Sequence, residues 1–194
     1  MEPTKYIWMN GKLVDWEQAN VHVLTHALHY GSGAFEGIRV YKAEKGAAVF
    51  RLREHIERLF YSSNALQMKI PFSVDDLCQA VLTNLRENKL EQGYIRPLVY
   101  FSYGVMGLNP KDAPVDVAIA AWPWGKYLPH EAVDVKISKY IRIHPQSTVA
   151  DAKLNGHYIN SIMAVQALRG TNYHEALFLD YKGDIAEGPG ENLF

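Results

Sequence analysis

The strand-like segments of this chain come in neighbouring pairs instead of alternating with helices. The segment from Tyr6 to Trp16 predicts two short strands joined at Asn10-Gly11, a dipeptide that tolerates the positive φ angles of a tight hairpin turn. Residues 37–42 and 47–50 predict a second pair of strands around a turn at residues 44–46. A parallel doubly wound sheet needs a helix after each strand, so this grouping predicts the α+β class.

Two helices are predicted after these strands. Within residues 52–68, Ile56 and Leu59 lie at helical spacing. Between Ser73 and Leu90, the Ser73 side chain is expected to cap the amide of Asp76, and leucine and valine side chains form a buried stripe. The other predicted elements are strands at 94–103, 115–122 and 133–140, a helix at 159–168 and a hairpin around 182–184.

A segment rich in proline and glycine, WPWGKYLPHEA, indicates a boundary between two domains. We expect a small N-terminal α+β domain over residues 1–122, a linker over 123–132 and the first part of a larger domain over 133–194.

The composition is that of a globular protein that binds a small molecule. Apolar residues make up 48% of the chain, and 20 Lys+Arg against 21 Asp+Glu give a formal net charge of −1. This balance produces no global field for nucleic acid or an anionic membrane. The single cysteine, Cys78, excludes an internal disulfide and a multi-cysteine zinc site and is compatible with a reducing compartment. Because we find neither an export signal nor a long apolar run, we expect a cytoplasmic protein.

Five segments carry residues suited to binding a cofactor or a substrate. They are HALHYGSGAFEGIR (26–39), REHIERL (53–59), YIRPL (94–98), AKLNGHY (152–158) and EGPGENLF (187–194). Each is a weak signal alone, but together and in this order they resemble the branched-chain amino acid aminotransferases. The resemblance implies a two-domain, fold-type IV enzyme, similar to D-amino acid aminotransferase, with pyridoxal 5′-phosphate (PLP) at the domain junction.

The resemblance also implies roles for four residues at the cofactor. Lys153 is expected to form an imine with the cofactor aldehyde and to act as the catalytic amine, which needs a partly desolvated site. Glu187 pairs with the pyridine nitrogen and keeps the ring an electron sink. Tyr158 donates to the ring oxygen and Arg58 binds the phosphate. Without the resemblance, each would more often be a solvated or simply packed residue.

For the substrate, the resemblance implies an apolar pocket and a carboxylate site. Aromatic walls suit an aliphatic side chain, whose full burial stabilises binding by roughly 1.5 to 3 kcal/mol. The expected pocket residues are Tyr30, Phe35, Gly37, Trp124 and Tyr127, and the expected carboxylate residues are Tyr94 and Arg96. Tyr30 and the loop of Leu108 are expected to reach across a subunit interface, so we expect a homodimer or a higher homo-oligomer.

The implied reaction transfers the amino group of L-leucine, L-isoleucine or L-valine to 2-oxoglutarate, in branched-chain amino acid biosynthesis. A D-amino acid aminotransferase or an aminodeoxychorismate lyase of the same fold would share Lys153 and Glu187, but is less compatible with HYGSGAFEGIR and YIRPL.

Three interpretations outside this fold remain open. His22, His26 and His29 are spaced i, i+4 and i+7, which on one helix would form a zinc site, although no HExxH is present. GSGAFEG is not a GxGxxG motif, so a nucleotide site has little support. A non-enzymatic binding module is the third interpretation.

The chain stops directly after the Glu187 motif, at ENLF. Family members continue beyond this point, so we expect a fragment of a longer enzyme, with the second domain incomplete. The missing part is expected to supply a helix N-terminus and loop amides for the phosphate, so this chain alone should be a poor enzyme or an inactive one.

Overall fold

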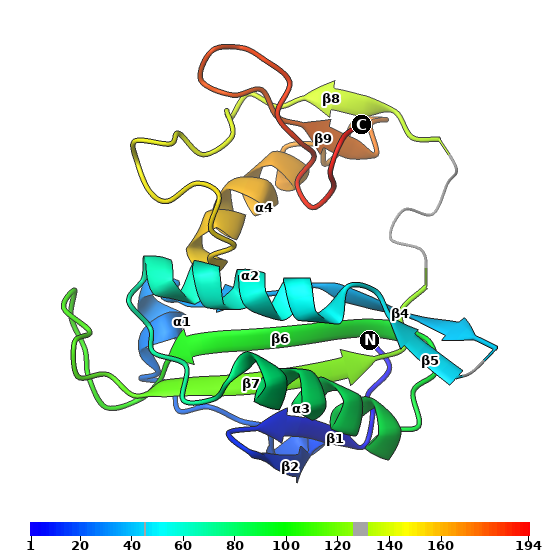
Figure 1. Ribbon diagram of the computed structural model, residues 1–194. Helices are drawn as coiled ribbons and strands as arrows, with labels where there is room; N and C mark the ends of the chain where they lie inside the picture. The colour runs from blue at the N-terminus through cyan, green and yellow to red at the C-terminus, as the bar shows by residue number, and fades with distance from the viewer. Residues whose placement is uncertain (45, 126–131) are drawn as a thin grey trace. The chain divides into compact units, whose positions relative to one another are not determined.

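The computed structural model describes residues 1–44, 46–125 and 132–194 (Figure 1). By its contacts the chain divides into two compact units. Unit 1 comprises Met1–Gly125 and Ala152–Asn155, and unit 2 comprises Lys126–Asp151 and Gly156–Phe194. Residues 152–155 therefore cluster with the N-terminal part, although they lie well beyond the predicted linker in the sequence. The described part of that predicted linker is residues 123–125 and 132.

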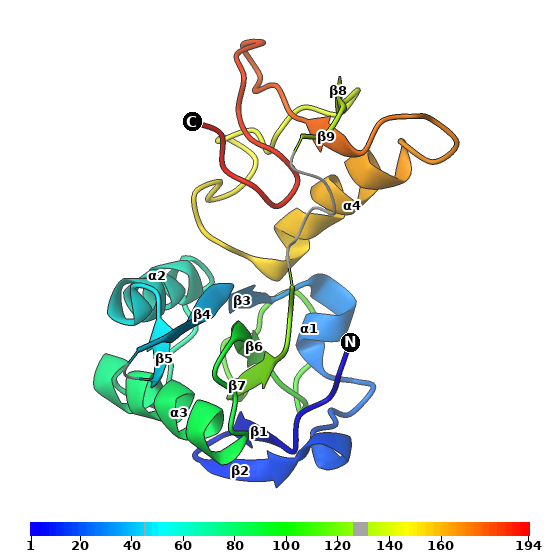
Figure 2. The ribbon, with the colours of Figure 1, turned by 90° about the vertical axis from the view of Figure 1, so that its right-hand side faces the viewer.

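Unit 1 is built on a seven-stranded sheet with helices on both faces. Its strands run β2-β1-β7-β6-β4-β5, and β3 pairs with β6. Figures 1 and 2 show α2 and α3 on one face and the short α1 on the other. The strands are β1 (Tyr6–Met9), β2 (Lys12–Asp15), β3 (Gly33–Phe35), β4 (Ile38–Ala43), β5 (Gly46–Val49), β6 (Gly93–Phe101) and β7 (Val115–Trp122), and the helices are α1 (His26–Tyr30), α2 (Leu52–Ala65) and α3 (Val74–Glu87), with a 3-10 turn at Trp16–Gln18.

The predicted hairpins and helices of unit 1 are confirmed. Asn10 and Gly11 have φ angles of 46° and 94°, as a tight turn between β1 and β2 requires. Ser73 Oγ accepts from the amide of Asp76 at 3.1 Å, and Asp76 accepts in return from the Ser73 amide at 2.9 Å, which completes a capping box. The core between the sheet and these helices includes fully buried Ile38, Ile56, Leu59, Leu77, Val81, Ile95 and Ile119.

Along the central strand β6, side chains that face the core alternate with side chains on the opposite face of the sheet. Along β6, Ile95 and Val99 are fully buried in the core, whereas Tyr94 and Arg96 are only half-buried. The two-residue period of a strand places Tyr94 and Arg96 on the opposite face, away from the core between sheet and helices. The strands of this sheet pair antiparallel and are grouped in the sequence, so the predicted α+β class is confirmed.

Unit 2 contains β8 (Val135–Ile137), α4 (Tyr158–Gln166) and β9 (Glu175–Leu177), and a 3-10 turn at Asn155–His157 begins on the last residue assigned to unit 1. β8 pairs with β9 in parallel, and the small core consists of Ala164, Leu168, Ala176 and Phe178. The predicted strand at 133–140 is too long, because Ser138 Oγ accepts from the Tyr140 amide at 3.0 Å and turns the chain. The predicted hairpin around 182–184 forms its turn, and its two arms are joined by an isolated bridge between Leu179 and Ile185 and by backbone hydrogen bonds of Phe178 with Ala186 and Glu187, without forming regular strands.

Within the described residues, no helix combines the length and the apolar character needed to cross a bilayer.

Candidate active site

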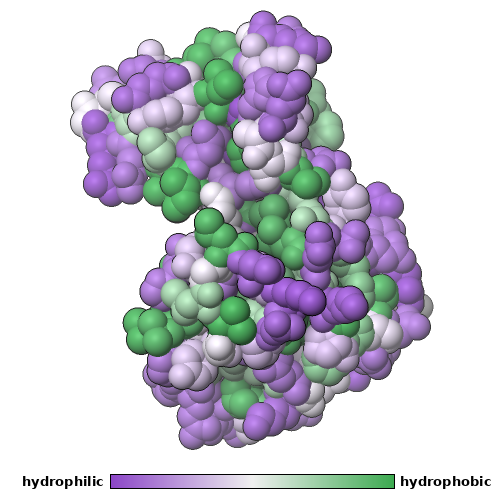
Figure 3. Space-filling model, turned by 90° about the vertical axis from the view of Figure 1, so that its left-hand side faces the viewer, coloured by the Kyte–Doolittle hydropathy of each residue, from purple (hydrophilic) through white to green (hydrophobic). Residues whose placement is uncertain are grey.

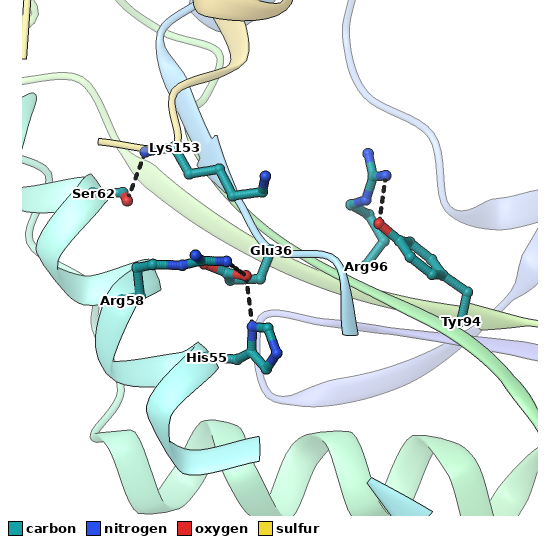
Figure 4. A network of polar contacts seen from close by, with 7 residues as sticks. All are labelled: Glu36, His55, Arg58, Ser62, Tyr94, Arg96 and Lys153. Atoms are coloured by element: carbon teal, nitrogen blue, oxygen red, sulfur yellow. Dashed lines mark hydrogen bonds and ion pairs between the residues drawn. The ribbon is translucent and has the colours of Figure 1, made fainter. Parts of the chain in front are cut away.

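Lys153 is fixed to unit 1 through its backbone. Its amide donates to Ser62 Oγ on α2 at 2.9 Å (Figure 4). Its carbonyl accepts from the Phe35 amide at 3.2 Å. Leu154 forms an isolated antiparallel bridge with Ala34 of β3. These contacts hold the lysine at the edge of the sheet, so its side chain extends from a rigid base.

Two cationic side chains contact the ring of Phe35. Lys153 Nζ lies 5.0 Å from the ring centroid and Arg96 Cζ lies 4.4 Å from it. Such cation–π contacts are favourable when the ring is shielded from water, and Phe35 is 8% exposed. The ring thus brings the lysine and the arginine to one place in unit 1, where an anionic ligand would meet positive charge on two sides.

Arg96, Tyr94 and Gly37 form a tightly packed group. Arg96 Nη2 donates to the Tyr94 hydroxyl at 3.1 Å (Figure 4). A Cβ on Gly37 would lie 1.9 Å from that hydroxyl, so only glycine allows the phenol to occupy this place. The Tyr94 ring also packs edge-on against Trp124, with 4.6 Å between centroids. Apolar and polar residues predicted for the substrate therefore come together here.

Arg96 also borders a cavity of about 260 Å³ in unit 1. Most of its wall is apolar, from residues such as Ile7, Met9, Leu28 and Leu98. Among the described residues, four that line the cavity have a buried polar atom without a hydrogen-bond partner: Arg96 Nε, Thr25 Oγ1, Tyr100 OH and Asn155 Oδ1. Burial raises the pKa of Tyr100 to about 12, so its phenol stays protonated at neutral pH. Buried polar atoms are normally paired, so these four have hydrogen-bonding capacity for water or a ligand.

Arg58 is held by a buried carboxylate. Its Nε and Nη2 donate to the two oxygens of Glu36 at 2.5 and 2.7 Å, and His55 Nδ1 lies 2.9 Å from Glu36 Oε2 (Figure 4). Glu36 is fully buried, whereas the Arg58 side chain is half exposed. Burial alone raises the pKa of Glu36, but the hydrogen bonds from Arg58 and His55 outweigh burial and hold this pKa below its ordinary value.

The other two predicted cofactor residues lie in unit 2. Glu187 Oε1 accepts from Arg142 Nε at 2.5 Å, and the Glu187 carbonyl accepts from the Phe178 amide at 3.0 Å. Arg142 also donates to Asn160 at 3.2 Å and stacks over the Phe178 ring at 5.5 Å. Tyr158 is the first residue of α4 and is half-buried. The structure therefore places Lys153 and Arg58 in unit 1, and Glu187 and Tyr158 in unit 2.

A comparison with known protein families shows the family to which this chain belongs. The family described as Amino-transferase class IV matches residues 33–194, a range that contains Lys153, Arg58, Tyr158 and Glu187. The chain belongs to the class IV aminotransferase family.

Branched-chain aminotransferases are similar to this class IV aminotransferase chain over nearly its whole length. The chain is 46% identical over 192 residues to a branched-chain-amino-acid aminotransferase of Pseudomonas aeruginosa, and 44% identical over 194 residues to that of Escherichia coli K12. Each match covers 97% of this chain, and the chain spans 62% and 63% of the length of those two relatives.

Solved structures of branched-chain aminotransferases share the fold. The crystal structure of the Escherichia coli enzyme superposes with a TM-score of 0.93 at 43% identity, over 96% of this chain and 63% of that one. The enzyme of Thermobaculum terrenum in its PLP form superposes with a TM-score of 0.88 at 30% identity, over 98% and 63%. As in these aminotransferases, the fold is fold-type IV.

Two further predicted residues of this class IV aminotransferase chain, Tyr30 and Leu108, are not part of the group around Phe35. Tyr30, whose ring packs against His26 with 4.5 Å between centroids, is 42% exposed, and Leu108 is 88% exposed. Tyr127 lies outside the described residues.

The three-histidine zinc hypothesis is wrong for the described part of the chain, where no three His, Cys, Asp or Glu side chains gather as metal ligands. Helix α1 begins at His26, so His22 is not on it. Both ring nitrogens of His26 already have partners, Ser32 Oγ at 2.6 Å and the Gly107 carbonyl at 2.8 Å. His29 Nε2 pairs with the Val23 carbonyl at 3.0 Å. His26 and His29 therefore stabilise the segment around α1 by hydrogen bonds and do not bind a metal.

Sequence reasoning missed Glu36, His55, Ser62 and Arg142. The spacing in the sequence could have indicated two of them, His55 and Ser62. His55 and Ser62 are spaced with Arg58 at i, i+3 and i+7 in α2, which places all three on one helix face. Nothing in the sequence around Arg142 indicates its pairing with Glu187, 45 residues further on.

Proposed function

We propose that the protein is a PLP-dependent branched-chain amino acid aminotransferase, which transfers the amino group of L-leucine, L-isoleucine or L-valine to 2-oxoglutarate. The observation that carries the proposal is the placement of Lys153, anchored to Ser62 and Phe35 beside Arg96, in a class IV aminotransferase chain. The branched-chain aminotransferases at 44 to 46% identity support this substrate class.

The residues present fit the cofactor. Lys153 offers a primary amine on a rigid backbone, Arg58 offers a guanidinium that pairs with Glu36, and Glu187 offers a carboxylate that Arg142 keeps in place. We assign to Lys153 the covalent bond to PLP, to Arg58 the phosphate, to Glu187 the pyridine nitrogen and to Tyr158 the ring oxygen. When bound, PLP supplies the electron sink for the charge left on the substrate Cα after it loses its proton.

The residues of the chain then bind the substrate and move its proton. Arg96 and Tyr94 receive the substrate carboxylate, since Arg96 Nε is a buried donor that has no partner among the residues the structure describes. Lys153 Nζ would take the proton from the substrate Cα as a general base and give it to the cofactor as a general acid, and in the second half-reaction it would carry a proton in the opposite direction.

The aliphatic side chain of the substrate needs an apolar pocket. We assign its walls to Phe35, Gly37 and Trp124, because the first two border Arg96 and Tyr94 and the third packs on the Tyr94 ring. Tyr127 is assigned to the same pocket from the family resemblance alone.

We propose that the protein acts in the cytoplasm as a homodimer or a higher homo-oligomer. Five apolar side chains between positions 21 and 30 are 42% to 71% exposed: Val21, Val23, Leu24, Leu28 and Tyr30. Figure 3 shows one face on which hydrophobic side chains reach the surface between hydrophilic ones. Exposed apolar side chains are common at interaction surfaces, and we assign to Tyr30 and the loop of Leu108 the completion of the apolar pocket of a partner subunit.

An enzyme for D-amino acids or an aminodeoxychorismate lyase is the second candidate, because either would use Lys153 and Glu187 in the same way. Steady-state assays of the full-length protein with L-leucine, D-alanine and aminodeoxychorismate separate the three. We expect turnover with L-leucine and 2-oxoglutarate, and preference for D-alanine would contradict the proposal.

Absorption spectroscopy tests the cofactor assignment. The full-length protein with PLP should change its spectrum when L-leucine is added, and borohydride reduction should place the pyridoxyl mass on Lys153. Lys153→Ala should abolish both signals, whereas Lys182→Ala, at an exposed lysine, should preserve them. A pyridoxyl group on another lysine would show that the assignment is wrong.

A further inference from the structure

Glu36 is a buried carboxylate without a role in the chemistry above. It lies between β3 and β4, at 0% exposure, and its carboxylate pairs with two side chains of α2. Its oxygens accept from Arg58 Nε and Nη2 and lie within 2.9 Å of His55 Nδ1. A buried ion pair is weak evidence for stability, because well-packed apolar residues often stabilise a fold equally well. The contribution of the pair to stability therefore does not by itself explain why this carboxylate is buried.

The geometry of the pair orients the arginine. Two parallel hydrogen bonds from one side of a planar guanidinium fix its plane as well as its position. The side used here is the one formed by Nε and Nη2, and the end of the fork, formed by Nη1 and the second hydrogen of Nη2, points in another direction. That end has the two-donor geometry that matches a pair of phosphate oxygens. The carboxylate is buried while the Arg58 side chain is 50% exposed, so a buried group holds a side chain that reaches the surface.

One face of α2 connects this arrangement with the lysine. His55, Arg58 and Ser62 lie on that face, and Ser62 Oγ accepts from the Lys153 amide at 2.9 Å. The same helix therefore sets the position of Arg58 and that of the Lys153 backbone (Figure 4). A shift of either would change the distance between a phosphate anchor and the amine.

We propose that Glu36 and His55 are positioning residues, which orient Arg58 for the phosphate of the cofactor. This inference rests on the proposed function. Glu36 also has an opposing effect, since its negative charge lowers the attraction of Arg58 for a phosphate. Orientation outweighs that effect, because water screens charge interactions at the half-exposed guanidinium, whereas without Glu36 the long arginine side chain loses its fixed plane.

The test compares two aldehydes that differ only in the phosphate. In the full-length enzyme, Glu36→Gln should weaken the binding of PLP about ten-fold or more and leave that of pyridoxal, which has no phosphate, within about two-fold. The control is Glu54→Gln on the same helix, whose carboxylate is exposed and pairs with Arg51, and it should change neither affinity. His55→Gln, which keeps both members of the ion pair, should weaken PLP binding by a few-fold and serves if Glu36→Gln does not fold.

A double-mutant cycle with Arg58→Ala completes the test. Once Arg58 is absent, Glu36→Gln should cause no further loss of PLP affinity. Equal losses for PLP and pyridoxal, tighter PLP binding, or losses that add to that of Arg58→Ala would each overturn the inference, as would unchanged PLP affinity in a folded His55→Gln. These results leave the proposed function standing, whereas a parent enzyme that binds no PLP would overturn both.

Discussion

The Tyr94 hydroxyl occupies the space that a side chain on Gly37 would need. A Cβ on Gly37 would lie 1.9 Å from this oxygen and 2.8 Å from the ring carbon that bears it. The ring has little room to retreat, because it packs against Trp122 and Trp124 with 5.2 and 4.6 Å between centroids. Gly37 therefore contributes to the site because the absence of a side chain leaves room for the Tyr94 hydroxyl.

Gly37→Ala should therefore displace the phenol and break its hydrogen bond with Arg96. We expect the kcat/KM for L-leucine to fall about ten- to a hundred-fold, since displacements of about 1 Å have effects of this size. Gly125→Ala is the control, because a Cβ there meets no atom within 4 Å. Equal kinetics for Gly37→Ala and the parent enzyme would remove Tyr94 from the substrate site.

Arg96→Lys should separate substrate binding from cofactor binding. Lysine keeps the charge but loses the planar fork that contacts Tyr94 and the Phe35 ring. The KM for L-leucine and for 2-oxoglutarate should both rise by about ten-fold or more, with PLP affinity unchanged. Steady-state kinetics and a PLP titration measure the two quantities, with Arg86→Lys on α3 as an exposed control. A parallel loss of PLP affinity would argue against the carboxylate role.

Arg142→Gln should affect both the stability of unit 2 and the cofactor. The Arg142 side chain is 17% exposed and its partner Glu187 is 35% exposed, so the pair is only partly screened by water. Loss of this charge-assisted bond should lower the free energy of unfolding by roughly 1 to 3 kcal/mol. PLP affinity should fall as well, because Glu187 is no longer held. Urea unfolding and PLP titration check this, and Arg169→Gln, at an exposed position, should change neither quantity.

Ser73→Ala tests the cap of α3 and its dependence on pH. Loss of the cap should lower the free energy of unfolding by about 1 kcal/mol at neutral pH. Hydrogen bonds from the side chain and the backbone of Ser73 hold the pKa of Asp76 below its ordinary value of 3.8. A carboxylate with a depressed pKa stabilises the fold above its unfolded pKa, and this stabilisation is lost as the pH falls through the folded value.

The difference between Ser73→Ala and the parent should therefore shrink as the pH falls below 3.8. Urea unfolding at neutral pH and at successively lower pH measures it. Thr83→Ala, on the same helix but away from the cap, should show no such pH dependence. A difference that stays constant down to acid pH would mean that Asp76 does not contribute to the cap.

Local patterns in the sequence determined the elements whose causes are local. The hairpin at Asn10-Gly11 and the helix that starts after Ser73 depend on residues within a few positions of each other, and both form as predicted. The motif around Lys153 identified the family for a different reason, since five segments had to agree in order. The strand predicted at 133–140 was too long because one serine side chain, Ser138, competes with strand pairing.

Only the tertiary structure decided which of these segments meet. Ser62 contacts Lys153 across 91 positions, Arg142 contacts Glu187 across 45, and Glu36 contacts Arg58 across 22. No periodicity links residues so far apart, because the contacts depend on how strands and helices pack and on which face each side chain occupies. The burial of Glu36 has the same origin. The sequence pattern predicted a strand at residues 37–42 but not β3, and the pairing of the Glu36 carboxylate with two side chains of α2 is a property of the fold.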